Sequence, residues 1–451
     1  MTSENAQPSA GSPGLRRALN RWDLILYGVM VIQLTAPMPV FGVLNARAHG
    51  HVVTTILLAM VGMLFTAVSY GRMAGAYPSS GSAFTYVSRE LSPVLGYVTG
   101  WGMLVDYVLN PLIVIVWCSK AAMNFVPQVP YPAWAVAFCA LFTGLNLVGV
   151  KNSARISGAL TALMGAVVVA FLICAGRYVL AHGHGTPGFF THPFYDPRRF
   201  NVHAVLGGTS IAVLTYIGFD GISTLSEEVE DPRRSILFAT VGTCLIIGLL
   251  SALEVYAAQL VWSAAVPFHD VDTAFVEVAA RVGGTWLFVL MNFTLLVANI
   301  GSGIGAQLGA ARLLYGMGRS NALPARFFGA VDRAHRIPRN NVVLVGLIAL
   351  GGAFLVSYSL GAEILNFGAL TAYMGVNAAA FVRFYLRADV RRLRDLWPPL
   401  VGFMACLFLW LNLSGKARIV GIAWMAIGLL IGAWRTGGFR KGALSFEMPP
   451  E

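Results

Sequence analysis

Residues 203–234 read HAVLGGTSIAVLTYIGFDGISTLSEEVEDPRR. The segment begins as an apolar run long enough to enter a bilayer, yet it carries the carboxylate of Asp220 between Gly218 and Gly221 and ends in acids and arginines. Glycine relaxes the backbone, and non-helical backbone at membrane depth is tolerated only where protein or water surrounds it. We therefore expect residues 215–221 to interrupt a membrane helix that lines a cavity.

The composition is that of an integral membrane protein. Of the 451 residues, 57% are hydrophobic and only 11% are charged, and the mean hydropathy is +0.69, outside the range of soluble proteins. The net charge is +11, but Lys and Arg are spread between apolar runs, so no nucleic acid partner is expected. The cysteines lie in apolar runs without CxxC spacing, which predicts neither disulfides nor a metal site, and no cofactor is expected.

At about 20 apolar residues per spanning helix, the chain predicts an all-α protein with about twelve transmembrane helices. They fall near residues 23–45, 52–73, 93–124, 133–150, 155–180, 203–226, 236–262, 285–316, 341–360, 364–386, 397–413 and 418–436. Most Lys and Arg residues lie in the connections on the same side as the N-terminus, which predicts that both termini are cytoplasmic. We expect a protein of the bacterial-type inner membrane, with tails at residues 1–20, which should be disordered, and 437–451.

The first span also contains a helix breaker. Residues 35–42 read TAPMPVFG, and a proline inside a helix removes a backbone hydrogen bond and clashes with the preceding turn. Interrupted spans one and six predict a LeuT-like inverted repeat of five helices, residues 21–180 and 203–386, followed by helices 11 and 12 at 397–436. Substrate would bind between the two breaks. The alternative is that Pro and Gly are simply more frequent in membrane helices.

Several motifs carry a family resemblance. YIGFDGISTLSEEVEDPRRSI in the sixth span and AYPSSGSAFTY after the second resemble the amino acid-polyamine-organocation superfamily of transporters. Within it, TAPMPVFG, GHV before the second span, GWGMLVDY in the third and GFDGISTLSEE are similar to bacterial putrescine importers. The resemblance covers nearly the whole chain and implies the twelve-helix fold and proton-driven uptake of an amine or amino acid. Met164 stands where many amino acid transporters of the superfamily have a lysine, the presumed proton carrier, so that role does not transfer to this chain.

Three carboxylates lie well inside apolar spans: Asp106, Asp220 and Glu254. Lys120, near the outer end of the third span, is the internal positive charge that could balance them. A charge in the membrane costs several kcal/mol unless it is paired, hydrated or neutralised, so such residues are functional candidates. With three acids against one base, the interior should attract a small cationic substrate or a proton.

Asp106 and Tyr107 suit the capture of an ammonium group, with Asn110 one helical turn further on. A carboxylate forms strong charge-assisted bonds with an amine, and a phenol ring adds a cation-π contact. The alternative for Asp106 is an ordinary hydrogen bond between helices. Asp220 lies beside the carbonyl groups that an unwound segment exposes. Its alternative role is to cap the second half-helix.

Glu254 has two possible roles, as a proton acceptor or as a carboxylate that faces water at the outer end of the seventh span. Four aromatic residues could cover the alkyl chain of a substrate, although aromatic residues in membrane helices more often serve packing. They are Trp101, Tyr216, Phe219 and Tyr373. Glu227 and Glu228 could form salt bridges with Arg233 and Arg234 that open with an inner gate, or they could belong to a solvated loop.

The break in the first span favours an amine over an amino acid. The resemblance implies that amino acid transporters bind the substrate carboxylate with free N–H groups of a glycine-rich break, but Pro37 and Pro39 have no N–H to donate. Thr35 and its neighbours could still bind a carboxylate. Thr35, Pro37 and Met38, with Gly218 of the sixth span, complete the predicted substrate site.

The sequence therefore predicts a secondary active importer of putrescine or a related amine, with protons as the coupling ion. The alternative is a cationic or neutral amino acid permease or exchanger. An enzyme is not expected, because no HExxH, GxSxG or paired Cys/His spacing occurs. A channel or receptor is a third possibility.

Overall fold

The computed structural model describes residues 19–78, 82–148, 154–182, 188–229, 231–263, 266–319, 323–332 and 337–439, without the side chains of residues 154–156 and Glu227. Most of the predicted tails, residues 1–18 and 440–451, therefore lie outside the described residues. The described part is helical and contains no β-strand; a single isolated bridge joins Leu19 to Val229. This confirms the predicted all-α class.

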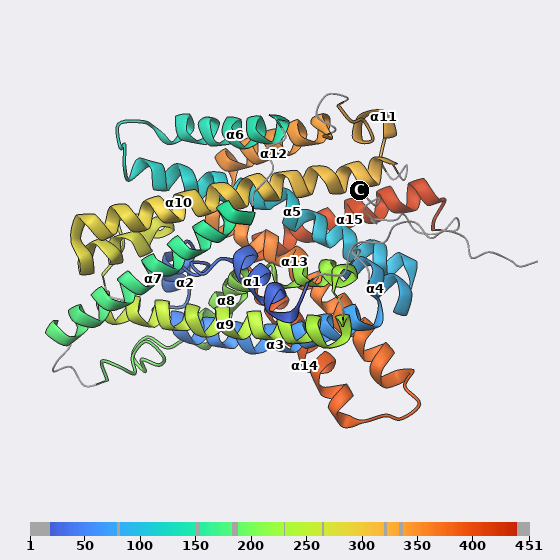
Figure 1. Cartoon of the computed structure of the whole chain (residues 1–451), viewed down its shortest axis with the longest axis horizontal. Helices are drawn as coiled ribbons and strands as arrows, with labels where there is room; N and C mark the ends of the chain where they lie inside the picture. Colours follow the sequence, from blue (N-terminus) through green and yellow to red (C-terminus); the bar gives the residue numbers. More distant parts are fainter. Residues whose placement is uncertain are drawn as a thin grey trace, which may run out of the picture.

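The elements follow one another as shown in Figure 1. They are α1 (Arg21–Ile32), α2 (Phe41–Arg47), α3 (Val52–Ala76), α4 (Ser82–Glu90), α5 (Pro93–Met123), α6 (Tyr131–Val148), α7 (Ala154–His182), α8 (Val202–Ala212), η1 (Val213–Tyr216), η2 (Phe219–Glu228), α9 (Pro232–Val261), η3 (Val271–Thr273), α10 (Ala274–Arg319), α11 (Ala325–Phe328), α12 (Arg339–Leu355), α13 (Tyr358–Phe381), η4 (Val382–Leu386), α14 (Leu393–Leu411) and α15 (Gly415–Thr436).

Ten helical segments of the described chain are long and apolar enough to cross a membrane. The two further spans predicted from the sequence are also helical, but one is divided into α1 and α2 and the other, α12, is a shorter apolar helix. Gly284, with φ of 68°, separates the first turns of α10 from the rest of that helix. The predicted span near 285–316 therefore starts directly after this interruption. The chain is a multi-pass membrane protein.

The predicted break in the first span is confirmed. α1 ends at Ile32, Gln33 has φ of 76°, and α2 begins only at Phe41. Between them the chain forms turns, including one from the N–H of Met38 to the carbonyl of Thr35 at 3.0 Å. Pro37 lies inside this turn, where it interrupts the regular hydrogen bonds of a helix.

The predicted break in the sixth span is confirmed as well. α8 continues into η1, which ends at Tyr216. Ile217 is extended, and η2 begins at Phe219. Gly218 between them has φ of 121°, a backbone conformation that residues with a Cβ rarely adopt. Glycine at this position therefore lets the chain change direction inside the membrane.

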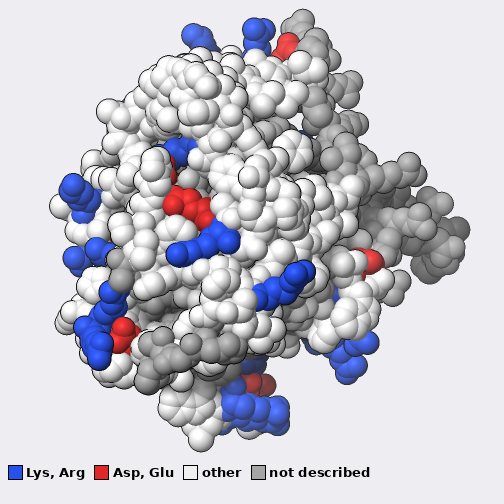
Figure 2. All heavy atoms as spheres, turned by 90° about the vertical axis from the view of Figure 1, so that its left-hand side faces the viewer, with Lys and Arg blue, Asp and Glu red and all other residues white. Residues whose placement is uncertain are grey.

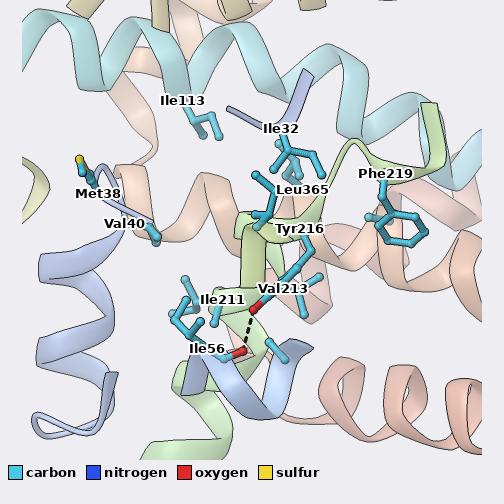
Figure 3. Packing of buried hydrophobic residues seen from close by; sticks show 14 of the residues in the cluster. Ile32, Met38, Val40, Ile56, Ile113, Ile211, Val213, Tyr216, Phe219 and Leu365 are labelled. Carbon is cyan, nitrogen blue, oxygen red and sulfur yellow. Dashed lines mark hydrogen bonds between the residues drawn. The ribbon is translucent and has the colours of Figure 1, made fainter. Parts of the chain in front are cut away.

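The two breaks lie against each other. A Cβ added to Gly218 would lie 3.1 Å from Cγ1 of Val31 and 3.2 Å from Cγ1 of Ile32, so the interruption of the sixth span packs on the last turn of α1. Figure 3 shows Ile32 beside the chain between Tyr216 and Phe219. That residues 21–180 and 203–386 are inverted repeats stays a prediction, but the meeting of their first helices is the geometry that it requires.

Long helices surround the breaks. α3 and α9 run side by side (Figure 1) and approach closely at small residues: a Cβ on Gly71 would lie 2.5 Å from Cα of Leu237. α5 contacts α10, α12 and α13, so it forms the centre of the remaining bundle. The breaks, α5 and α13 are thus neighbours in the interior, although they are far apart in sequence.

Candidate substrate site

Asp220 lies at the break of the sixth span and is held by neutral donors. Its Oδ1 accepts the N–H of Gly218 at 3.2 Å and the hydroxyl of Tyr373 on α13 at 3.3 Å. The hydroxyl of Ser223 donates to the carbonyl of Asp220 at 2.6 Å and closes the first turn of η2. The side chain is partly exposed, and no cationic side chain of the described residues forms an ion pair with it. Asp220 therefore binds the N–H of Gly218, the residue before η2, and presents a carboxylate to the interior.

Asp106 on α5 faces the same region. It is partly exposed, within electrostatic reach of Asp220, and in no ion pair with a described side chain. The ring of Tyr107 packs toward α10, where a Cβ on Gly309 would lie 3.3 Å from it, and Tyr107 is still 36% exposed. Both carboxylates lie within electrostatic reach of this side chain, which places Tyr107 next to the two acids. Asn110, one turn further on, has a buried Oδ1 without a hydrogen-bond partner in the described structure.

Tyrosines surround Asp220. Tyr27, Tyr70, Tyr107 and Tyr373 all lie within electrostatic reach of its carboxylate. The rings of Tyr70, Phe219 and Tyr373 pack on one another, with centroids 5.3–5.6 Å apart. Three of these residues, Tyr107, Phe219 and Tyr373, are predicted from the sequence, whereas Tyr27 and Tyr70 are not. The signal that could have found them is a phenol inside an otherwise apolar span.

The break of the first span offers few hydrogen-bond donors. The N–H groups of Ala36 and Met38 bond to carbonyls within the break, at 3.3 and 3.0 Å. The hydroxyl of Thr35 donates to the sulfur of Met164 at 3.5 Å, so the position where related amino acid transporters have a lysine touches the break. Pro37 and Met38 are buried here.

A further contact fixes this break to α10. The side-chain amide of Gln33 donates to the carbonyl of Ala298 at 3.1 Å. The N–H groups of Leu34, Thr35 and Val40 are the donors of the break that find no backbone acceptor among the described residues. The break thus has three N–H groups without a backbone partner among those residues.

Two predicted aromatic residues pack elsewhere. The buried Tyr216 donates its hydroxyl to the carbonyl of Ile56 on α3 at 2.8 Å, as drawn in Figure 3. Trp101 stacks on Trp424 of α15, with centroids 5.1 Å apart, and donates to its carbonyl at 2.8 Å. Both side chains join neighbouring helices, so neither belongs to the candidate substrate site.

Glu254 on α9 is fully buried. Neither of its carboxylate oxygens has a hydrogen-bond partner in the described structure, and the hydroxyl of Ser251, one turn earlier, is also without one. The possibility that Glu254 faces water at the end of the span is therefore wrong for this structure. An ionised carboxylate without any partner inside a membrane protein costs several kcal/mol, so the neutral, protonated form fits this environment.

Lys120 does not balance the central acids. Its ammonium contacts Asp272 at 2.6 Å and Asp270 at 3.1 Å, both next to η3 at one end of the bundle. The centre therefore keeps two carboxylates without a cationic partner among the described residues.

The predicted inner gate is only partly visible. The side chain of Glu227 lies outside the described residues. Glu228 forms no ion pair with Arg233 or Arg234 among the described side chains, and it lies within electrostatic reach of Tyr27 instead. The gating role of these acids stays a prediction.

Comparison with known proteins shows the family of the chain. The family model described as amino acid permease matches residues 40–446. The chain belongs to the amino acid permease family. This permease is 33% identical over 453 residues to the low-affinity putrescine importer PlaP of Escherichia coli K12, with 99% of each chain covered. It is 24% identical to the branched-chain amino acid permease BcaP of Bacillus subtilis, with 94% of each chain covered. Over 84% of its length and 65% of the relative's, it is 25% identical to the vacuolar cationic amino acid transporter 4 of Arabidopsis thaliana. The chain is therefore a transporter and not an enzyme.

Proposed function

We propose that this permease imports putrescine or a related amine across the inner membrane by proton-coupled alternating access. The observation that carries the proposal is the pair of partly exposed carboxylates, Asp106 and Asp220, which lie within electrostatic reach of each other without a cationic partner among the described residues. A cationic substrate satisfies both groups, since charge-assisted hydrogen bonds to an ammonium are stronger than neutral ones. The full-length similarity to a putrescine importer supports the same substrate class.

The surroundings of the two acids favour an alkylammonium. Asp220 is within reach of the phenol rings of Tyr107 and Tyr373, and aromatic faces attract ammonium groups when water is excluded. One end of a diamine would bind Asp220 and the other Asp106, with Tyr107 beside the chain. A single carboxylate would hold a monoamine less tightly.

Protons are the proposed coupling ion, and Glu254 is the proposed carrier. It is buried and unpartnered in the described structure, so it can hold a proton in one state and release it when a conformational change hydrates it.

The packing supports a state that is closed at the η3 end. Phe41 on α2 packs on Phe275 and Phe268, with centroids 5.3 and 5.9 Å apart, and blocks the way from the first break to that end. At the other end, the partly exposed Tyr27 lies within reach of both Asp220 and Glu228. By the positive-inside rule, the η3 end is the external one, and both chain termini are cytoplasmic.

A cationic or neutral amino acid permease or exchanger is the second candidate. The free N–H groups of Leu34 and Thr35 favour it, because two donors can bind a substrate carboxylate. The similarity to BcaP and to the plant cationic amino acid transporter also fits this class.

A substrate panel in proteoliposomes separates the two. We expect unlabelled putrescine and cadaverine to compete with uptake of radiolabelled putrescine, and lysine, arginine and leucine to compete far less. An inward proton gradient should raise accumulation. Uptake of an amino acid that putrescine does not inhibit would favour the second candidate.

A further inference from the structure

A second pair of carboxylates lies far from the central site, at the η3 end. The Lys120 ammonium contacts Oδ2 of Asp272 at 2.6 Å and Oδ1 of Asp270 at 3.1 Å. Lys120 is on the same helix as Asp106, about 21 Å further along its axis at about 1.5 Å per residue. Figure 2 looks onto this end of the molecule and shows acidic and basic side chains next to each other in a mostly uncharged face.

The chain around η3 is arranged to present these carboxylates. Oδ1 of Asp270 also accepts the N–H of Asp272 at 2.9 Å, which fixes the first turn of η3. The carboxylate of Glu277 accepts the N–H groups of His269 and Asp270, at 3.1 and 3.0 Å, and holds the preceding segment. The Asp270 carboxylate is therefore oriented by the backbone, whereas the partner of the Asp272 carboxylate is Lys120.

η3 also closes the bundle over the first span. A Cβ on Gly42 of α2 would collide with the carbonyl of Val271, so η3 and α2 touch backbone to backbone. η3 packs on α5 as well, where Lys120 reaches it. A movement of η3 away from α2 and α5 would break the bonds of Lys120 to the aspartates.

The charges of this site do not balance. One ammonium faces two carboxylates, and all three side chains are partly exposed, so a further cation is attracted to them. Two phenols, Tyr131 and Tyr358, lie within electrostatic reach of Asp272. The site thus already holds an alkylammonium, in a setting of carboxylates and aromatic rings like that of the central site.

We infer that Asp270 and Asp272 form an external amine site, which the Lys120 ammonium occupies in the closed state and the substrate ammonium takes over when the η3 end opens. The inference rests on the proposed amine substrate. Exchanging one ammonium for another keeps the two carboxylates paired while η3 moves, and the partly exposed Lys120 ammonium is released to water. Lys120 and the substrate ammonium then compete for the same two carboxylates.

The competitor role predicts opposite effects for the two partners of one ion pair. In right-side-out vesicles, D272N should raise the KM for external putrescine about fivefold, the range for a partly exposed ion pair. K120Q should lower the KM, because the competing ammonium is gone. D196N, which removes another carboxylate from the same end of the molecule, is the matched control and should leave the KM unchanged.

The KM values of the two variants distinguish competition by Lys120 from a purely structural role. If Lys120 only clamps η3, both K120Q and D272N break the clamp and shift the KM in the same direction, which overturns the inference, as does an unchanged KM in both. Size-exclusion profiles and thermal unfolding identify a variant that fails to fold, and D270N then replaces D272N. If the wild-type permease takes up no amine, the proposed function fails instead.

Discussion

Tyr373 on α13 donates its hydroxyl to Asp220 at the break of the sixth span, with 3.3 Å between the two oxygens. The same ring packs on Phe219 and Tyr70. Tyr373 therefore links the carboxylate proposed to bind the ammonium to a helix that does not belong to either break.

Removing this hydroxyl should weaken amine binding without unfolding the protein. A neutral donor to a carboxylate contributes about 1–2 kcal/mol, so Tyr373→Phe should raise the KM for putrescine about five- to thirtyfold. Tyr216→Phe is the matched control, because its hydroxyl bonds to the backbone of α3. An equal rise in KM in both variants would show that Tyr373 acts through packing.

Gly218 and Gly221 flank Asp220 but are expected to differ in their tolerance of a side chain. Gly218 has φ of 121° and close neighbours on α1, whereas a Cβ on Gly221 would meet nothing within 4 Å. Gly218→Ala should be destabilised by about 1–3 kcal/mol and lose most uptake. Gly221→Ala should retain both, as measured by thermal unfolding and initial uptake rates. If Gly218→Ala behaves like Gly221→Ala, the break does not need a positive φ.

Glu254 is expected to couple transport to protons. Glu254→Gln removes the exchangeable proton, so an inward proton gradient should no longer drive accumulation, while exchange of labelled for unlabelled putrescine should continue. Glu363→Gln is the control, because Glu363 is buried but already accepts the N–H of Ser414. Accumulation in Glu254→Gln at the wild-type level would assign the coupling to another group.

An ion-pair network at the opposite end from η3 should contribute to stability. The buried Glu90 contacts Arg387 at 2.8 Å, Arg383 at 3.5 Å and the hydroxyl of Tyr77 at 2.5 Å. Burial, and then the bond to Glu90, raise the pKa of Tyr77, so the hydroxyl keeps the proton that it donates.

Glu90→Gln should therefore lower the free energy of unfolding by about 1–3 kcal/mol. Arg394→Gln should leave it unchanged, because the Arg394 side chain is 71% exposed and lies 4.0 Å from Asp395. Thermal unfolding in detergent compares the two variants. Equal midpoints for Glu90→Gln and the wild type would mean that water replaces the network without loss.

The features that the sequence predicted are those that act locally. Pro37 and Gly218 interrupt a helix wherever they stand in it, so both breaks could be placed before any packing was known. Apolar runs likewise located the spans, whereas the short helices α4 and α11, η3 and the first turns of α10 were missed.

Contacts between distant segments could not be read in the same way. The partners of Lys120 lie about 150 residues further along the chain, and nothing in the local pattern connects them. Tyr70 stands out in the sequence as a phenol in an apolar span, but its neighbours come from three other helices, so its place beside Asp220 could not be predicted. Trp101 is different: five residues before Asp106, at about 100° per residue, its side chain points to another face of α5, and helical geometry alone could have removed it from the predicted site.

The central claim is that Asp106 and Asp220 together bind an amine. Equilibrium binding of radiolabelled putrescine to the purified permease, compared with Asp220→Asn and Asp106→Asn, tests it most directly. We expect both variants to lose at least about tenfold in affinity, since each removes a charge-assisted bond of about 1.5–3 kcal/mol, while their thermal unfolding stays close to that of the wild type. Wild-type affinity in Asp220→Asn would contradict the account.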